Sequence, residues 1–378
     1  MSTALAPQTP HASASDAKAG PLRKLVAPLI EAETFDFWVQ KINPVWSWSR
    51  PLARVVARRA EAADTVTLEL QANAHCALPR PGQHLNVSAE VNGRRVTRSY
   101  SVTNVPGAER RIAITVKRVE GGTLSHHLVR DAKVGDVLTL GPAFGDMTWP
   151  LQPANVAPQW VLLGAGSGIT PLISLTRFWA ARRLAVPLTL VYWVKTYDEA
   201  AFLPELRELA RQRPQFQFHL VVSHEARRNP GDLEGLISAE QLATVAPDLD
   251  RSQVYACGPG GFVAAAQQLC QPRAAGFMAE GFTPAPLADD EAERTVQVTL
   301  RQSGRTLQVS TGQSLLAALE AQGLNPPSGC RMGICHTCSC PRVSGTTTDM
   351  GDGHHHDEPG GAVRLCVSRA RSDLTLDL

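Results

Sequence analysis

The chain has 378 residues, enough for two to four domains of ordinary size, and we take three as the first interpretation. Its 37 lysines and arginines nearly balance 35 aspartates and glutamates, which argues against a nucleic-acid partner and against strong electrostatic attraction to a membrane. No apolar run reaches the roughly 20 residues of a membrane helix, and the first twenty residues lack a signal-peptide pattern. These features predict a soluble, cytoplasmic protein without a transmembrane segment.

The first fifty residues divide into two parts. Residues 1–21 are small and polar, and they predict a disordered terminus because they lack the apolar side chains that a core requires. Residues 22–50 interleave leucine, phenylalanine and tryptophan with charges, which indicates a helical segment of one or two amphipathic helices. In one interpretation these helices pack onto the next domain. In the other they dock on a partner or a membrane surface.

The sequence pattern of the remaining residues predicts three folded units. Residues 51–150 contain short alternating segments separated by Pro-Gly, Asn-Gly and Gly-Gly turns, which predicts a small antiparallel barrel. Residues 151–285 alternate apolar strands with helices, a pattern typical of a parallel sheet covered by helices. A Pro-rich, acidic linker at 286–294 leads to residues 295–378, which predict two strands, a helix and a cysteine-rich loop.

Four cysteines near the C-terminus give the most specific signal. Cys330, Cys335 and Cys338 have the spacing C-x4-C-x2-C, and Cys366 follows after 27 residues, as in plant-type [2Fe–2S] sites. Such crowding indicates a metal site because disulfides are rare in a reducing cytosol. Structural zinc is the alternative, although zinc ribbons usually carry two C-x2-C knuckles. Cys340 is interpreted as a bystander in the strand leaving the loop.

A second candidate site lies at the end of a barrel strand, in the run Arg98-Ser99-Tyr100-Ser101. An arginine can neutralise a flavin phosphate through several N–H donors, and a tyrosine offers a flat face for stacking on the isoalloxazine ring. The Ser101 hydroxyl can donate toward flavin N5. Four residues alone are a weak signal, since an ordinary strand with an exposed arginine looks the same.

A third candidate site follows the apolar strands of the second unit. The run from Gly164 to Pro171 has the spacing G-x-G-x-G-x-x-P and opens a helix, where glycines and free N–H groups favour a pyrophosphate. Cys257-Gly258-Pro259 ends another strand, the edge at which open parallel sheets bind nucleotides. A third strand is followed by Ser223, Arg227 and Arg228. The two arginines favour NADPH over NADH because a 2′-phosphate needs charged donors.

Together these motifs resemble the ferredoxin–NADP reductase superfamily, and residues 22–378 resemble its flavin reductases with a C-terminal plant-type ferredoxin domain. The segment VKRVEGGTLSHHL (116–128), the turn GPAFGDM (141–147) and the ending Glu280-Gly281-Phe282 are similar to further segments of that family. The resemblance implies a six-stranded antiparallel flavin-binding barrel, a parallel-sheet nucleotide-binding domain and a β-grasp ferredoxin domain. One departure is His336, where the family often has glycine.

The resemblance also implies the chemistry. Hydride passes from NAD(P)H to FAD, with FMN the less favoured flavin, and single electrons then pass to the cluster. Ser101, Cys257 and Glu280 are the implied catalytic residues, with Cys257 beside nicotinamide C4 and Glu280 hydrogen-bonded near the flavin. The implied cofactor-binding residues are Arg98, Tyr100, Ser101, Val116, Lys117, Gly122, Thr123, Leu124, Ser125, Gly164, Gly166, Gly168, Thr170, Pro171, Ser223, Arg227, Arg228, Cys257, Gly258, Pro259 and Phe282.

The electron acceptor is predicted by resemblance alone. The segment WSWSRPLARV and the loop RMGICHTC look most like reductases that serve membrane-bound fatty-acid (acyl-CoA) desaturases, which would bring the chain to the inner membrane through its partner. Reductase components of aromatic-ring or alkane oxygenases share the three modules and are the alternative. A non-enzymatic, ferredoxin-type electron carrier is the third possibility. The run His354–His356 is interpreted as a solvated loop.

Overall fold

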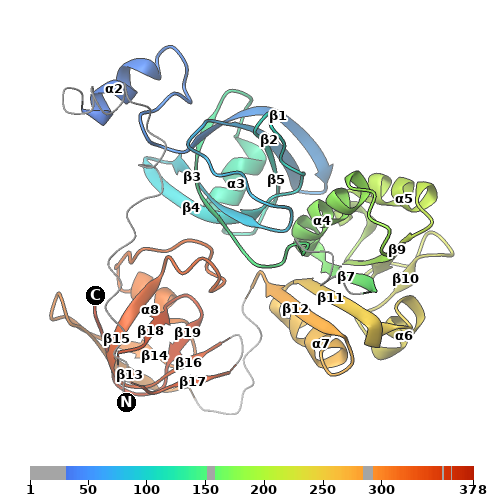
Figure 1. The fold of residues 1–378 in the computed structure, drawn as a ribbon. Helices are drawn as coiled ribbons and strands as arrows, with labels where there is room; N and C mark the ends of the chain where they lie inside the picture. The colour runs from blue at the N-terminus through green and yellow to red at the C-terminus, as the bar shows by residue number, and fades with distance from the viewer. Residues whose placement is uncertain (1–30, 151–157, 284–292, 351–352, 359) are drawn as a thin grey trace, which may run out of the picture.

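The computed structural model describes residues 31–150, 158–283, 293–350, 353–358 and 360–378, arranged as three units (Figure 1). The predicted disordered terminus at 1–21, the first part of the helical segment at 22–50 and most of the linker at 286–294 lie outside the described residues. Within the described ranges, no helix combines the length and the apolar character needed to cross a bilayer.

The first unit is an antiparallel barrel, as predicted. Its sheet has the order β4-β3-β6-β1-β2-β5, and a bridge between Val102 and Ile114 joins the two ends of that order. One helix, α3 (Thr123–Arg130), buries Leu124 and Leu128 against the interior of the barrel. The strands are β1 (Leu52–Ala62), β2 (Thr65–Ala72), β3 (His84–Val91), β4 (Arg94–Ser101), β5 (Arg111–Lys117) and β6 (Val137–Phe144).

The second unit is a parallel sheet in the order β10-β9-β8-β7-β11-β12, again as predicted. Its central strands are apolar throughout because helices cover both faces, α4 and α5 on one and α6 and α7 on the other. The elements are β7 (Gln159–Ala165), α4 (Ile169–Ala181), β8 (Leu188–Val194), α5 (Leu203–Gln212), β9 (Phe216–Val222), β10 (Leu233–Glu234), α6 (Ala239–Val245), β11 (Ser252–Gly258), α7 (Gly260–Cys270) and β12 (Gly276–Gly281).

The third unit pairs its first strand in parallel with its last, β13 with β20, inside a five-stranded sheet of order β14-β13-β20-β15-β18. Helix α8 packs Leu315 and Leu319 into the same core as Cys338 and Cys366. A small sheet β17-β16-β19 lies beside it. The elements are β13 (Thr295–Leu300), β14 (Thr306–Ser310), α8 (Leu315–Ala321), β15 (Ser339–Ser344), β16 (Thr347–Asp349), β17 (His355–His356), β18 (Ala362–Arg364), β19 (Ser368–Ala370) and β20 (Leu374–Leu376).

From residue 31 onward, the segment before the barrel contains the short helix α2 (Ala32–Val39). Its buried residue is Asp36, whose carboxylate accepts hydrogen bonds from the Trp48 N–H at 2.6 Å and the Ser47 hydroxyl at 2.7 Å. Burial by itself would raise the pKa of Asp36, but these bonds and Arg50 lower it. Phe37 and Trp38 are instead 58 % and 62 % exposed. In the described part of this segment, α2 is therefore anchored by a carboxylate, and not by the packed apolar face that an amphipathic helix predicts.

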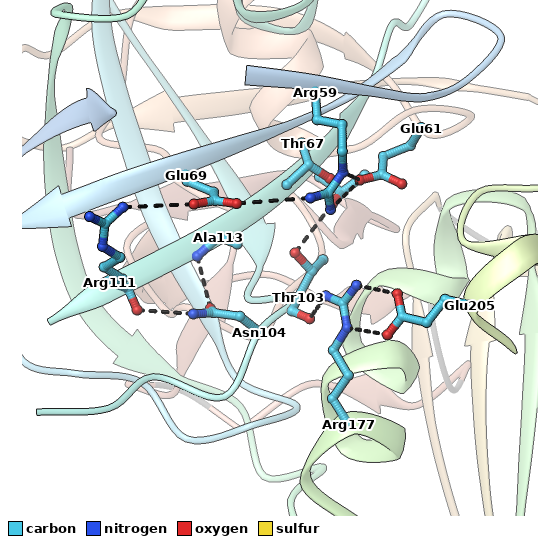
Figure 2. A network of polar contacts seen from close by, with 11 residues as sticks. Arg59, Glu61, Thr67, Glu69, Thr103, Asn104, Arg111, Ala113, Arg177 and Glu205 are labelled. Carbon is cyan, nitrogen blue, oxygen red and sulfur yellow. Dashed lines mark hydrogen bonds and ion pairs between the residues drawn. The ribbon is translucent and has the colours of Figure 1, made fainter. Parts of the chain in front are cut away.

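Polar contacts tie the barrel to the second unit (Figure 2). Arg177 on α4 donates to the backbone oxygen of Thr103 in the barrel, and its other nitrogens form a two-point ion pair with Glu205 on α5, at 2.7 and 2.6 Å. Thr103 in turn accepts a hydrogen bond from Thr115 on β5 at 3.2 Å. The C-terminal half of α4 is thereby held against the barrel.

Candidate functional site

A cavity of about 270 Å³ opens where the three units meet. Its walls come from the barrel, from the loop before α4, from the residue after β12 and from the cysteine loop of the third unit. The lining residues are His84, Arg98, Ser99, Tyr100, Ser101, Thr115, Lys117, Val119, Gly122, Thr123, Leu124, Ser125, Ser167, Thr170, Phe282, Cys330 and Met332. The cavity therefore joins the flavin motif to the first cysteine of the cluster motif.

Strand β4 carries three predicted flavin residues to this cavity. Tyr100 is half-buried there, and burial raises the pKa of its phenol, so the ring stays neutral. Arg98 lies in the same wall and donates to the Thr97 carbonyl at 2.7 Å. Burial, together with the like charge of Arg331, lowers the pKa of Arg98, although a guanidinium remains charged. The cavity thus offers an aromatic face and a positive charge side by side.

The start of α3 forms the polar end of the cavity. The first N–H groups of a helix have no partner inside it, and here they belong to Thr123, Leu124 and Ser125 in the cavity wall. The Ser125 hydroxyl accepts from the Val119 N–H at 3.2 Å and fixes the turn. A side chain at Gly122 would lie 2.5 Å from the Ser125 oxygen, so glycine is required there. This arrangement suits an anion such as a phosphate.

Two predicted residues of β5 have different surroundings. Val116 is fully buried in the barrel core and does not line the cavity, whereas Lys117 lines it and pairs with Glu199 at 2.6 Å. The Lys117 ammonium therefore forms an ion pair with a carboxylate of the second unit.

A chain of hydrogen bonds runs behind Ser101. Its hydroxyl lies 3.1 Å from Nδ1 of His84, and Nε2 of His84 lies 2.6 Å from the carboxylate of Glu280 on β12. Thr170, near the start of α4, lies 3.2 Å from the Ser101 oxygen. Phe282 lines the cavity, but Glu280 does not; its contact with the cavity wall runs through His84. These hydrogen bonds join the barrel to the nucleotide-binding unit.

The glycine loop connects β7 to α4 at the carboxyl edge of the sheet. Gly166 has a φ of +53°, a left-handed conformation that favours glycine. A side chain on Gly168 would come within 2.0 Å of the Cys257 backbone oxygen, and a side chain on Gly164 within 3.1 Å of Leu172. These glycines therefore let the loop approach β11 closely. Pro171 is buried in the first turn of α4.

The glycine loop after β7 and the segment at the end of β11 flank a switch point of the sheet. From β7 the chain runs to β8 on one side, while β11 lies on the other, and crevices at such points receive nucleotides in open sheets. Gly258 ends β11, and Pro259 precedes the first residue of α7. The Cys257 thiol is fully buried, 3.3 Å from the Met147 sulfur, and it does not line the cavity. Burial, with the charge of Glu280 as a further cause, raises the pKa of this thiol.

The predicted nucleotide-discriminating residues follow β9 on the same edge of the sheet. The Ser223 hydroxyl lies 2.8 Å from Nδ1 of His224. Arg228 forms an ion pair with Glu225 at 3.1 Å, and its guanidinium lies 4.6 Å from the centre of the Tyr197 ring. Arg227 is exposed, and its guanidinium forms no ion pair with the residues that the structure describes, so it is available to an anion.

The four predicted cluster ligands form two pairs, Cys330 with Cys335 and Cys338 with Cys366. Cys335 and Cys338 each have a lowered pKa, since each accepts a hydrogen bond from a partner thiol, and the partners Cys330 and Cys366 have a raised pKa for the same reason. Backbone N–H groups of Met332 and Cys335 also point at the Cys330 sulfur, both at 3.3 Å.

These pairs fit a [2Fe–2S] cluster, in which each iron takes two thiolates. Among the residues that the structure describes, no three His, Cys, Asp or Glu side chains converge as a site for one ion. N–H groups aimed at the sulfurs are the contacts that tune a cluster's potential. His336 is exposed with a φ of +55°, which explains why glycine suits this position in related loops.

Sequence reasoning missed several residues of the cavity wall. His84 belongs to no motif used above, and its partner Glu280 is 196 positions away. Met332 lies two residues after Cys330, so its place in the cysteine loop was a usable signal. Ser167 lies inside the glycine run and was passed over because its neighbours carried the pattern.

Three family models match the chain in order. They are "Oxidoreductase FAD-binding domain" at residues 53–149, "Oxidoreductase NAD-binding domain" at 162–268 and "2Fe-2S iron-sulfur cluster binding domain" at 298–371. The chain is also 32 % identical over 364 residues to an NADPH oxidoreductase of Mycobacterium tuberculosis, covering 94 % of this chain and 92 % of the relative. It belongs to the ferredoxin-reductase-type flavoproteins with a C-terminal [2Fe–2S] domain.

Other members of this family have named partners. A glycine betaine monooxygenase reductase subunit of Chromohalobacter salexigens is 28 % identical over 322 residues, which covers 79 % of this chain and 87 % of the relative. Among solved structures, phthalate dioxygenase reductase matches with a TM-score of 0.58 and 26 % identity, covering 86 % of this chain and 97 % of that one. Both names refer to oxygenase systems.

As a ferredoxin-reductase-type oxidoreductase, the protein uses FAD, NAD(P)H and a [2Fe–2S] cluster. This outcome confirms the predicted fold class, enzyme class and cofactor set. The desaturase partner has no counterpart among the relatives described above, whose names favour the oxygenase alternative.

Proposed function

We propose that this chain is the reductase component of an oxygenase system. It would take hydride from a nicotinamide nucleotide and deliver single electrons through its own cluster to a separate oxygenase. One observation carries the proposal: Tyr100 and Ser101 share a cavity wall with Cys330 and Met332, so the flavin motif and the cluster loop border the same space. The names of the relatives support the choice of an oxygenase as the acceptor.

Different residues of the cavity would bind different parts of FAD. Arg98 and the N–H groups at the start of α3 would neutralise the phosphates, and Tyr100 would stack on the ring system. A second hollow, of about 470 Å³, adjoins the first through Gly122 and Thr123 and is lined also by His126. FAD carries an adenylate beyond the phosphate that would bind at the start of α3, whereas FMN does not. The second hollow could receive this adenylate, which supports FAD over FMN.

The nucleotide would bind along the carboxyl edge of the parallel sheet. The loop Gly164–Gly168 and the start of α4 would hold the pyrophosphate, and Gly258 and Pro259 would border the nicotinamide beside Cys257. Arg227 and Arg228 lie after β9 with at least one guanidinium available, which supports NADPH over NADH. FAD supplies the conversion of a two-electron donor into single electrons, which the cluster requires.

The oxygenase partner is tested by reconstitution. The purified chain is combined with NADPH, oxygen and a purified candidate oxygenase component, and oxygen uptake coupled to product formation is measured. The control is Cys338→Ser, which keeps the flavin and nucleotide residues. We expect coupled turnover with the wild type and none with the control.

Two outcomes contradict the proposal. Turnover that persists in Cys338→Ser would mean that electrons bypass the cluster. Turnover with desaturase-containing membranes and a fatty-acyl substrate, but with no oxygenase, would assign the chain to the desaturase partner that its N-terminal segment and cysteine loop resemble. NADPH and NADH are compared in the same assay, and equal kcat/KM values would remove the role proposed for Arg227 and Arg228.

A further inference from the structure

We propose that Asn86 of the barrel donates a hydrogen bond to the sulfur of Cys335 when the cluster is bound, and so raises the reduction potential of the cluster. Ser99 is the positioning residue that orients the Asn86 amide. The proposal rests on the proposed passage of electrons from the flavin to the cluster and on Cys335 as a cluster ligand. It does not depend on the identity of the oxygenase.

The side chain of Asn86 points out of the barrel toward the third unit. Its neighbours on β3, Leu85 and Val87, are buried in the barrel core, and successive side chains of a strand point to opposite faces. The Asn86 amide nitrogen lies 3.1 Å from the position that a Cβ on Gly329 would take. Gly329 directly precedes Cys330, so a polar side chain of the barrel lies beside the cysteine loop.

Three polar groups surround one point beside Gly329. A Cβ there would lie 2.9 Å from the Cys335 sulfur, 3.0 Å from the Thr337 hydroxyl oxygen and 3.1 Å from the Asn86 nitrogen. Glycine leaves this point free, and the amide of Asn86 and the sulfur of Cys335 are therefore near neighbours. The sulfur already accepts hydrogen bonds from the Cys330 N–H at 3.2 Å and from Thr337.

The Asn86 amide is oriented from the barrel side. Its oxygen accepts a hydrogen bond from the Ser99 hydroxyl at 2.6 Å, which leaves the amide nitrogen to face the cysteine loop. A side chain on Gly141 of β6 would come within 3.0 Å of the Asn86 Cβ, so the strands hold this residue closely. The nitrogen donates no hydrogen bond to the residues that the structure describes, and it is available to the sulfur. Ser99 itself lines the flavin cavity.

A donor at a ligand sulfur stabilises the more negative state of a cluster. Reduction adds one electron, the negative charge on the sulfurs grows, and an N–H group aimed at a sulfur then interacts more strongly. The Asn86 amide therefore favours electron uptake by the cluster. The transfer moves one electron from the reduced flavin to the cluster. No bond forms or breaks in it, and both amide hydrogens stay on the Asn86 nitrogen.

The donor and the acceptor of this bond belong to different domains. The bond exists only while the ferredoxin domain lies against the barrel, which is the arrangement in which the cluster receives electrons from the flavin. A cluster that leaves the barrel to meet an acceptor loses the Asn86 donor, and its potential falls. The contact thus favours electron uptake beside the flavin and electron delivery away from it.

Redox titrations of the full-length, FAD-loaded protein test this role. Asn86→Leu keeps the size of the side chain but removes its N–H groups, and Ser99→Ala removes the hydroxyl that orients them. The control is Ser88→Ala, because Ser88 follows Asn86 on the same face of β3 and bonds Thr97 of β4 at 2.7 Å. Ser88 lines a different hollow, which is bordered by residues that follow α2. The cluster potential is measured by electron paramagnetic resonance and the flavin potential by visible absorbance, with dithionite as the reductant.

We expect the cluster potential of Asn86→Leu to fall by about 59 mV, which is a tenfold change in the one-electron equilibrium between flavin and cluster. Ser99→Ala should lower it less, because the amide remains, and Ser88→Ala should match the wild type. An unchanged cluster potential in Asn86→Leu would overturn the proposal even if electron transfer were slower, since slower transfer alone indicates altered docking. An equal fall in Ser88→Ala, or in the flavin potential of Asn86→Leu, would also overturn it.

A spectroscopic measurement on the wild type does not depend on the variants folding. The reduced cluster is paramagnetic, so electron–nuclear double resonance detects an amide nitrogen bonded to a ligand sulfur in protein made with side-chain nitrogen-15 asparagine. We expect a nitrogen-15 coupling in the wild type that is lost in Asn86→Leu or, if that variant does not fold, in Asn86→Asp. No coupling in the wild type, or the same coupling in the variant, would overturn the proposal. A wild-type cluster that dithionite reduces but NADPH does not would instead contradict the reductase assignment, which is a separate result.

Discussion

The barrel meets its two neighbours in different ways. Toward the nucleotide domain it forms a series of hydrogen bonds, including His84 to Glu280 at 2.6 Å and the Gly82 N–H to the Ser174 hydroxyl at 2.8 Å. Trp149 adds a bond to the Leu175 carbonyl at 3.0 Å. Toward the ferredoxin domain, no hydrogen bond or ion pair is found among the described residues. The two domains are nevertheless adjacent there, since a Cβ added to Gly329 would lie 3.1 Å from the side-chain nitrogen of Asn86.

The difference matches the two kinds of transfer. Hydride transfer joins two atoms at bonding distance, so the flavin and the nucleotide must be held in one fixed geometry. Electron transfer needs only a close approach, and the cluster must also meet an outside acceptor. Arg331 fits this division, because its charge is neutralised by Glu320 within the ferredoxin domain, at 2.5 and 2.9 Å, and not by the barrel. An interface without such bonds permits close approach without fixing one geometry.

The largest effect is expected from removing the cluster. Cys338→Ser deletes one thiolate of a pair, so the cluster should be lost and electron delivery to a protein acceptor abolished, while NADPH-dependent ferricyanide reduction continues. Visible absorbance and the two activities are measured on one preparation. Simultaneous loss of ferricyanide reduction would mean that the ferredoxin domain is needed to hold the barrel and the nucleotide domain together. That result would contradict the difference between the two interfaces.

A second effect is expected inside the nucleotide domain, in the loop that borders the hydrogen-bonded interface. Gly168→Ala places a methyl group 2.0 Å from the Cys257 backbone oxygen, so the glycine loop must move away from β11. We expect a loss of about 1–3 kcal/mol in the free energy of unfolding and a marked rise in KM for NADPH. Gly231→Ala is the control, because nothing lies within 4 Å of its added methyl. Equal behaviour of the two variants in urea unfolding would contradict the close approach.

The folds of the separate units can be predicted from the sequence, whereas the contacts between units cannot. The antiparallel barrel, the parallel sheet and the cysteine set follow from local signals: alternating short segments, strand–helix alternation and cysteine spacing. The pairing of His84 with Glu280 does not follow from such signals, because it joins two units and depends on how the barrel docks. The left-handed His336 is likewise invisible to a spacing rule.

A smaller effect is expected from a single bond of the tight interface. Arg177→Ala removes the bridge from α4 to Thr103 and Glu205 and should cost about 2 kcal/mol, since hydrogen bonds to charged groups are worth that order. Flavin fluorescence on heating should report a lower transition, while the visible absorbance of the cluster should be lost at an unchanged temperature. Arg211→Ala, an exposed arginine paired within α5, is the matched control. A common shift of both signals would contradict separate units.

The smallest effect is expected at the unbonded interface. Met332→Ala shortens a side chain that lines the cavity beside Cys330, so flavin-to-cluster transfer should slow by about ten-fold or less, while hydride transfer is unchanged. Met332→Leu keeps the volume and should behave as the wild type. Bleaching of the flavin and of the cluster is followed at separate wavelengths after mixing with NADPH. Slower hydride transfer in Met332→Ala would show that this interface also fixes the nucleotide geometry.

The central claim is that electrons pass in series from the nucleotide to the flavin and then to the cluster within one chain. Rapid freezing of the wild type after anaerobic mixing with one equivalent of NADPH, followed by electron paramagnetic resonance and optical spectra, tests it directly. We predict that flavin bleaching precedes the signal of the reduced cluster and that the cluster signal grows as flavin electrons are lost. A cluster signal that rises before the flavin is reduced, or never rises while the flavin stays reduced, would contradict the account.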